Sequence, residues 1–190
     1  MRKKECQLQI NNVDVLELND KGMARFRNDH IGFIFQFHQL LPEFTALENV
    51  CIPAFIKKTP RAKAEQRAKE LLDFLGLSHR HDHKPNELSG GEQQRVQLAR
   101  VLCQVWLPVL DGRPRYLLLD EPVSSLDIKH QLIIMNIAQT FAVSGGGVLA
   151  VLHDLNLTAR FADQVAMMHR GRLVASGPPN EVFNDELVSD

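Results

Sequence analysis

The stretch YLLLDEP, residues 116–122, sets an apolar run directly before two adjacent carboxylates and a proline. An apolar run of this kind is typical of a strand that is buried on both faces of a parallel sheet. Proline ends such a strand because it has no N–H to donate to the ladder. Asp120 and Glu121 are therefore predicted at the carboxyl end of a buried strand, where α/β sheets gather their ligands.

Short apolar runs at 31–35 (IGFIF) and 148–152 (VLAVL) predict further buried strands of the same kind. Helical periodicity appears between these runs, at 89–104 and 132–143. Strands that alternate with helices build parallel sheets, so we predict an α/β fold with a mostly parallel sheet.

Smaller elements are predicted towards the ends of the chain. Residues 7–18 alternate loosely, as an edge strand or a hairpin arm does, and residues 19–30 indicate a short helix followed by a loop. Residues 165–168 and 172–175 predict a closing hairpin.

The middle of the chain has a helical pattern. It runs from Pro42 to Leu77, and a polar loop follows at 78–86. We predict one domain over residues 1–190, with a small helical lobe at approximately 37–104 inserted into the α/β core. The helical segment 61–75 places these apolar side chains on one face: Ala64, Ala68, Leu71, Leu72 and Leu75.

Composition excludes several classes of protein. The formal net charge of −1 and the pI of about 6.7 leave no basic surface for nucleic acid. Cys6, Cys51 and Cys103 are far apart and odd in number, so we expect neither disulfides nor a cysteine zinc site, and a reducing cytosolic location fits. No apolar run approaches the length of a membrane span, so any membrane contact is expected through partner proteins.

Asp120 and Glu121 have the chemistry that phosphoryl transfer needs at a sheet edge. A hard cation neutralises phosphate oxygens and is held by carboxylates, which suits Asp120. A second group must orient or deprotonate the attacking water, which suits Glu121. Gln36 and His153 follow the neighbouring strands, and a histidine there could hydrogen-bond a phosphate. The alternatives are an ordinary buried strand that ends at Asp-Glu-Pro and a structural histidine.

Residues 88–92, LSGGE, predict a helix N-terminus that can bind an anion. Ser89 and Glu92 fit a capping box, and Gly90 and Gly91 leave the backbone N–H groups accessible. The aligned peptide dipoles add roughly half a positive charge at such an end. The alternative is an ordinary capped helix that follows a loop.

A phosphate-binding loop does not accompany these motifs in the 190 residues. None of the 11 glycines is followed by lysine, so the pattern G-x-x-x-x-G-K-[ST] is absent. The sequence therefore offers acids, a histidine and a helix terminus, without the usual cradle for the β- and γ-phosphates.

Taken in order, Gln36, LSGGE, LLLDEP, SSLD (residues 124–127) and His153 resemble the nucleotide-binding subunits of ATP-binding-cassette (ABC) transporters over roughly residues 10–182. The resemblance implies a P-loop NTPase-like sheet that here lacks the N-terminal Walker A strand, loop and helix. It implies ATP and Mg²⁺ as cofactors. Asp120 corresponds to the Walker B magnesium aspartate, and Gln36 to the Q-loop glutamine, which touches the magnesium site and relays to the membrane subunit.

The same resemblance implies further roles for single residues. Glu121 corresponds to the catalytic base, His153 to the switch histidine and Asp127 to the D-loop aspartate, part of the nucleotide-binding set. The signature, which completes the ATP site of the opposite subunit in a head-to-tail dimer, corresponds to Ser89, Gly90, Gly91 and Glu92.

Partners, location and cargo are also implied by the resemblance. The partners are an integral-membrane transporter subunit and a second nucleotide-binding subunit, and the location is peripheral, on the cytoplasmic face of the inner membrane. Residues 35–50, together with 79–96, resemble the lipoprotein-releasing ATPases. The chain from Gln97 onward, with its extra segment 105–115, resembles the haem and siderophore import ATPases. Both cargoes stay open, as does a hybrid coding sequence.

Without the Walker A cradle we expect no appreciable ATPase activity from these residues alone. The chain would be either the ATP-binding subunit of a transporter or a non-hydrolysing partner whose LSGGE completes the site of an intact second subunit. A DNA-repair or chromosome-maintenance ATPase is disfavoured, because the stretch between Gln36 and Ser89 is compact. The missing strand is also expected to leave apolar sheet surface exposed or to bring the neighbouring strands together, with marginal stability.

Overall fold

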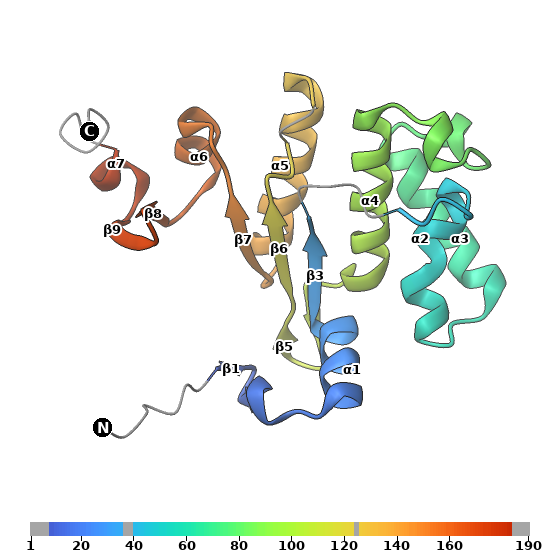
Figure 1. The fold of residues 1–190 in the computed structure, drawn as a ribbon, viewed down its shortest axis with the longest axis horizontal. Coiled ribbons are helices and arrows are strands. Elements are labelled where there is room, and N and C mark those ends of the chain that lie inside the picture. The colour runs from blue at the N-terminus through green and yellow to red at the C-terminus, as the bar shows by residue number, and fades with distance from the viewer. Residues whose placement is uncertain (1–7, 36–39, 124–125, 184–190) are drawn as a thin grey trace.

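The computed structural model describes residues 8–35, 40–123 and 126–183, and its centre is a parallel sheet (Figure 1). The strands, in the order in which they lie, are β3 (Ile31–Ile34), β6 (Tyr116–Asp120) and β7 (Gly147–Val151). Both pairings are parallel, with Ile34 beside Leu119 and Asp120 beside Val151. The predicted α/β sheet is therefore confirmed, and all of its strands end at one edge.

Helices pack on this sheet and on one another. Helix α4 lies against β3 and α5 lies against β7, while α2 and α3 pack on α4 (Figure 1). The helices are α1 (Asp20–His30), α2 (Ala46–Ile56), α3 (Arg61–Phe74), α4 (Gly90–Val105), α5 (Ile128–Val143), α6 (Leu155–Phe161) and α7 (Pro179–Val182). The apolar face predicted for residues 61–75 is buried, as expected. The separate helical lobe at 37–104 stays a prediction.

Two helix boundaries differ from the sequence prediction. Helix α5 begins at Ile128 instead of Leu132, because Asp127 caps it and so allows an earlier first turn. Helix α1 occupies the whole of 20–30, where a loop was expected at the end.

The polar loop at 78–86 contains short 3₁₀ turns at Ser78–Arg80 and Pro85–Glu87. A third such turn follows the N-terminal hairpin, at Val15–Glu17.

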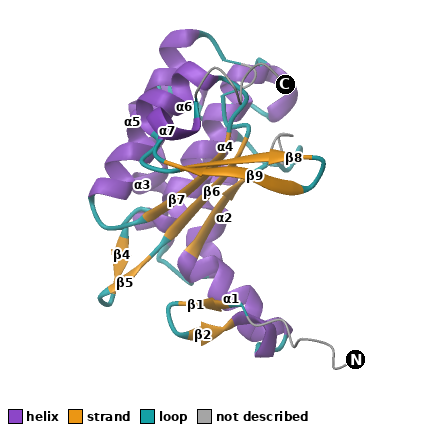
Figure 2. Cartoon of the chain, turned by 90° about the vertical axis from the view of Figure 1, so that its left-hand side faces the viewer, coloured by secondary structure: helices purple, strands orange, loops and turns teal. Residues whose placement is uncertain are grey.

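Antiparallel hairpins complete the described chain (Figure 2). Of the two alternatives expected within 7–18, an edge strand or a hairpin arm, the structure shows the hairpin. The closing hairpin after residue 164 is confirmed. A further hairpin, in the segment before β6, was not predicted. The hairpin strands are β1 (Gln9–Ile10) with β2 (Val13–Asp14), β4 (Val109–Leu110) with β5 (Arg113–Pro114), and β8 (Val165–His169) with β9 (Arg172–Gly177).

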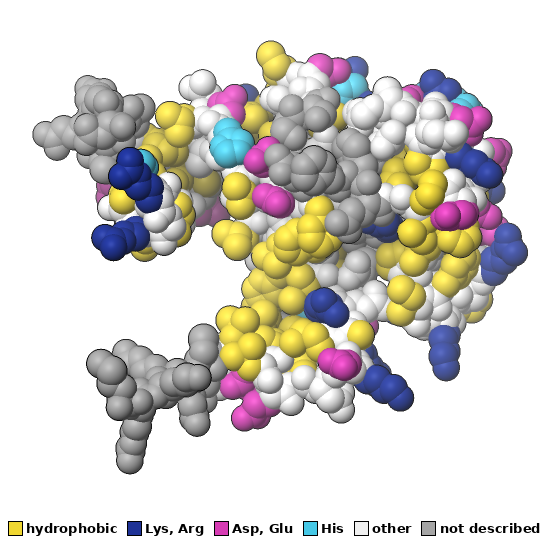
Figure 3. All heavy atoms as spheres, in the orientation of Figure 1, with side chains coloured by type: hydrophobic (Ala, Val, Ile, Leu, Met, Phe, Trp, Pro, Cys, Tyr) yellow, Lys and Arg dark blue, Asp and Glu magenta, His cyan; other side chains and the backbone are white. Residues whose placement is uncertain are grey.

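Strand β7 lies at the edge of the described parallel sheet, and the β8–β9 hairpin forms a separate sheet. Leu149 and Val151 on β7 are 65% and 49% exposed. Figure 3 shows apolar side chains gathered along the hollowed side of the molecule, between its N-terminal end and the β8–β9 end. Apolar side chains of β7 are therefore exposed at this edge, and their link to a missing strand stays a prediction.

Gly32 allows β3 to approach α4 closely. A Cβ atom at Gly32 would lie 2.6 Å from Cγ1 of Val101 and 2.7 Å from Cγ2 of Val105. Both valines are buried, so neither can move into solvent to make room. The packing of α4 on the sheet thus depends on a residue without a side chain at this position.

We expect Gly32→Ala to lower the free energy of unfolding by about 1–3 kcal/mol, because the added methyl group overpacks the contact between β3 and α4. Urea unfolding measures the loss. Val105→Ala removes one of the crowding methyl groups, so the double variant should lose less than the sum of the single losses. Strictly additive losses would contradict the close approach.

Candidate functional site at the carboxyl edge of the sheet

Glu121 and His153 meet at the carboxyl edge of the parallel sheet. Asp120 is the last residue of β6, Glu121 follows it, and His153 follows β7. The Nε2 atom of His153 lies 2.7 Å from Oε1 of Glu121. The carboxylate only accepts, so this ring nitrogen carries the proton and donates it. The structure thus brings together two residues that the sequence placed on neighbouring strands, whereas Gln36 lies outside the described residues.

Glu121 has an unusual backbone conformation. Its φ angle is +47°, in the left-handed region, which costs a residue with a Cβ atom about 1–2 kcal/mol. Its backbone N–H donates to the carbonyl of Val151 at 3.2 Å and so extends the pairing of β6 with β7. The Glu121 side chain is 19% exposed, whereas that of His153 is 76% exposed. Strain of this kind is found preferentially at functional sites, where it aims a side chain.

The LSGGE turn begins α4 with the predicted capping box. The Ser89 hydroxyl accepts from the backbone N–H of Glu92 at 3.3 Å, and the Glu92 carboxylate accepts from the backbone N–H of Ser89 at 2.8 Å. Gly90 and Gly91 are the first residues of the helix. A second oxygen of Glu92 pairs with Nε of Arg80 at 2.8 Å. Ser89 and Glu92 therefore serve the helix start and bond to each other.

Two buried glutamines on α4 were not predicted as part of the site. Gln94 donates to the carbonyl groups of Glu121, at 3.5 Å, and of Pro122. Gln97 donates to the carbonyl of Phe35 at 3.5 Å, directly after β3. The sequence signal that could have revealed them is their place among the apolar positions of α4, because a buried amide group requires hydrogen-bond partners. These bonds attach the LSGGE helix to the carboxyl ends of β3 and β6.

The motifs and the fold agree with a comparison against protein families. A family model described as ABC transporter matches residues 1–124. The chain belongs to the ABC transporter family. ATPase domains of this family bind ATP with Mg²⁺, and they work in pairs and with integral-membrane subunits.

Hemin import proteins are similar to this chain over much of its length. HmuV of Chelativorans sp. (strain BNC1), a hemin import ATP-binding protein, is 66% identical over 184 residues, which cover 92% of this chain and 68% of that protein. HmuV of Rhizobium meliloti (strain 1021) is 62% identical over 185 residues, covering 96% and 68%. HmuV of Mesorhizobium japonicum is 65% identical over 127 residues, covering 67% and 47%. The chain therefore spans about half to two thirds of the length of these relatives.

Solved ABC cassettes share the fold. The dimeric ATP-binding cassette MJ0796, bound to ADP and Pi after hydrolysis, superposes with a TM-score of 0.80 at 32% identity, covering 93% of this chain and 74% of that one. The cbiO1 protein of Clostridium perfringens, part of the ABC transporter complex cbiONQ, gives a TM-score of 0.73 at 28% identity, covering 94% and 68%. The P-loop NTPase-like fold is thereby confirmed.

The side chains at this edge fit the cofactors of an ABC ATPase. Mg²⁺ prefers oxygen ligands and is usually held by one or two carboxylates together with phosphate oxygens, a role that the half-buried Asp120 at the end of β6 suits. A cage of three or more His, Cys, Asp or Glu side chains does not occur among the described residues, and this cation does not need one. The glycine-rich start of α4 suits an anionic phosphate.

We expect acid to destabilise the LSGGE turn through Glu92. The pKa of Glu92 is lowered from 4.5 to about 2, first by the hydrogen bond from the Ser89 backbone and then by Arg80, against the opposing effect of burial. The charged form therefore stabilises the fold above about pH 4.5, and this contribution is lost as the pH falls towards 2. Glu92→Gln should lower the free energy of unfolding by about 1–2 kcal/mol near neutral pH and by progressively less in acid.

Chemical unfolding at a series of pH values measures this effect. Glu48→Gln is the matched control, because Glu48 closes the same kind of capping box at the start of α2. A constant difference between Glu92→Gln and the unchanged protein from neutral pH to acid would contradict the role of the charge.

Proposed function

We propose that this chain is the ATP-binding subunit of an ABC transporter that imports hemin. The observation that carries the proposal is the hydrogen bond between His153 and Glu121, 2.7 Å long, at the sheet edge where Asp120 ends β6. It joins Glu121, the proposed acceptor for the proton of water, to a histidine that holds the direction of its carboxylate.

Each residue at this edge has a proposed part in hydrolysis. Glu121 takes the proton as the water oxygen attacks the γ-phosphorus and the bond to the β-phosphate breaks. His153 donates to Glu121 and so fixes the direction of its carboxylate. Asp120, with Gln36, would hold Mg²⁺, which neutralises charge on the phosphate oxygens when bound.

The LSGGE turn is proposed to serve a second subunit. Its hydrogen bonds do not consume all of the first N–H groups of α4, because a helix leaves its initial donors without partners inside the helix. Gly90 and Gly91 place no side chains over these groups. Ser89, Glu92 and these glycines would thereby bind the nucleotide of the partner, with Asp127 contributing from the turn before α5.

Hemin is the favoured cargo. The Chelativorans relative is 66% identical over 92% of the chain, so one hemin import protein resembles both the front and the back of the sequence. A hybrid origin is not needed to account for either part. Lipoprotein release, suggested by residues 35–50, is the alternative. No helix in the described part of the chain is long and apolar enough to cross a membrane. We propose a peripheral position on the cytoplasmic face of the inner membrane, where the chain docks on an integral-membrane subunit.

The 190 residues are proposed to be inactive alone and to act as half of a shared site. The test mixes the chain with the Chelativorans relative after the relative's own signature has been disabled. ATPase activity is expected from the mixture and from neither protein alone, because only the mixture combines a phosphate loop with a working LSGGE.

Two results would count against these statements. Turnover by the 190 residues alone would disprove their inactivity, and failure of the mixture would disprove the role of LSGGE in a second subunit. The cargo is tested with the same pair docked on the membrane subunit of the Chelativorans transporter in lipid vesicles. Hemin uptake is expected, and release of lipoprotein without hemin uptake would favour the alternative.

A further inference from the structure

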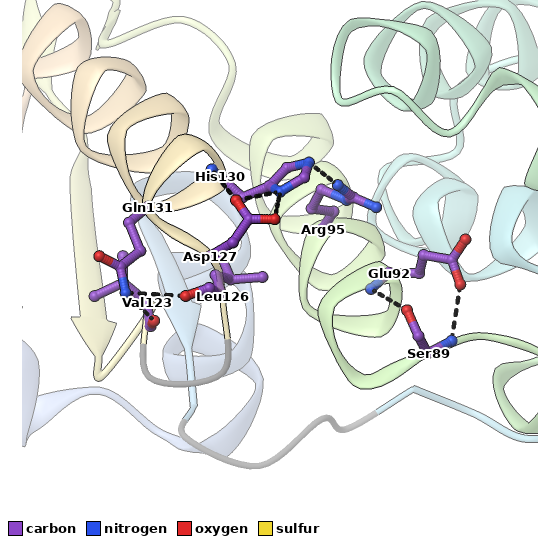
Figure 4. A network of polar contacts seen from close by, with 8 residues as sticks. All are labelled: Ser89, Glu92, Arg95, Val123, Leu126, Asp127, His130 and Gln131. Atoms are coloured by element: carbon purple, nitrogen blue, oxygen red, sulfur yellow. Dashed lines mark hydrogen bonds and ion pairs between the residues drawn. The ribbon is translucent and has the colours of Figure 1, made fainter.

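Arg95, His130 and Asp127 form a chain of contacts between α4 and α5 (Figure 4). Asp127 caps α5, since its Oδ1 accepts from the backbone N–H of His130 at 2.9 Å. The His130 ring returns to the same carboxylate, with Nδ1 2.9 Å from Oδ1 and 2.8 Å from Oδ2. On the other side of the ring, Nε2 contacts the guanidinium of Arg95 on α4. The imidazole therefore lies between an anion and a cation.

These partners decide which ring nitrogen carries the proton. An ionised carboxylate only accepts, so Nδ1 must donate to Asp127. A guanidinium only donates, so Nε2 must accept from Arg95. The pKa of Asp127 is lowered, first by the hydrogen bond from the His130 backbone and then by that from its ring, in agreement with a charged acceptor. The contact thus requires a neutral ring, because a second ring proton would point at Arg95.

Neighbouring contacts hold the same turn. Gln94, on α4, donates to the carbonyl of Pro122. Gln131, on α5, donates to the carbonyls of Val123 at 3.3 Å and Leu126 at 3.0 Å (Figure 4). The turn before α5 is therefore attached to α4 through Pro122 and to α5 through Val123 and Leu126. The histidine also joins these two helices.

We propose that His130 is a positioning residue that, in its neutral form, joins the LSGGE helix to the turn that carries Asp127. The proposal rests on the proposed function, in which both features face the second subunit. The Asp127 side chain is 65% exposed and that of His130 is 27% exposed, so the carboxylate can face a partner while its anchor stays largely covered. Without the link, Asp127 and the LSGGE turn would move independently and would less often be aligned for the same nucleotide.

Three substitutions separate the two halves of the link in the mixed-pair ATPase assay. His130→Ala removes both contacts and is expected to lower the rate about tenfold or more. His130→Asn keeps an amide donor near Asp127 but cannot reach Arg95. His130→Gln can accept from Arg95 and is expected to recover more of the rate than the alanine variant. Lys129→Ala, at the exposed neighbouring position on α5, is the control and should leave the rate unchanged.

The dependence on pH is a second readout, which a purely structural role would not move. Among the described residues, the charged groups in contact with the ring are Asp127 from its own turn and Arg95 from α4. Acid that protonates the ring would place two donors face to face. The rate with the unchanged chain should therefore fall more steeply in acid than the rate with His130→Gln. Parallel pH profiles, or a full rate with His130→Ala, would overturn the proposal.

The link is also tested without ATP hydrolysis. Arg95→Ala, His130→Ala and the double variant are compared by urea unfolding, and non-additive midpoints are expected if the side chains are coupled. The unchanged chain could fail to give ATPase activity in the mixture while the urea unfolding midpoints are non-additive. That result would disprove the proposed function and would support the contact between Arg95 and His130. Additive midpoints would overturn the link whatever the activity.

Discussion

Gly91→Asp is expected to lower the ATPase rate of the mixed pair by about 10²- to 10³-fold, the usual effect of losing an anion-stabilising donor. Gly91 is the second residue of α4, where backbone N–H groups without partners inside the helix attract anions. A carboxylate there would place a negative charge against the phosphate of the partner's nucleotide. Steady-state release of phosphate by the mixture measures the effect.

Ala62→Asp is the matched control for this charge. Ala62 is the second residue of α3, and it is exposed. Acidic residues in the first turn of a helix favour the helix, so both variants should fold with unfolding midpoints near that of the unchanged chain. A full rate with Gly91→Asp would contradict anion binding at LSGGE. An equal loss with Ala62→Asp would show that the added charge acts at a distance from the nucleotide.

Local patterns predicted most of the fold. The strands at 31–35, 116–119 and 148–152 were found because apolar runs between helical segments have few other solutions. The start of α5 was missed, since an apolar period does not reveal a cap that precedes it. The β4–β5 hairpin was also missed, because each of its strands is only two residues long and too short to show a period.

The part of the site that follows directly after the strands could be predicted from the sequence. Parallel strands end at the same edge, so Glu121 and His153 could be placed together from the sequence, and they are hydrogen-bonded. The left-handed backbone of Glu121 could not be foreseen, because it arises where the chain leaves β6 while still bonded to Val151 of β7. The contacts of Gln94 and His130 join segments far apart in the chain, and only the packing of α4 beside α5 brings them together.

Glu121→Gln is expected to lower ATP hydrolysis by about 10²- to 10⁴-fold, the range for loss of a general base. The measurement requires a complete site, so the chain is first joined to the segment that precedes the matched region in the Chelativorans relative. That extension should give the chain hydrolytic activity of its own. A glutamine oxygen can still accept from His153, so the hydrogen bond seen at 2.7 Å should persist while the proton acceptor is lost.

Asp163→Asn is the matched control for this substitution. Asp163 is an exposed acid in the turn before β8, outside the proposed site, so replacing it with its amide should leave the rate unchanged. Nucleotide binding separates two explanations for a loss with Glu121→Gln. Unchanged ATP affinity with a low rate assigns the loss to proton transfer, because the amide keeps the shape of the side chain. A rate within about tenfold of the unchanged chain would remove Glu121 from the role of base, since that lies below the range expected for such a group.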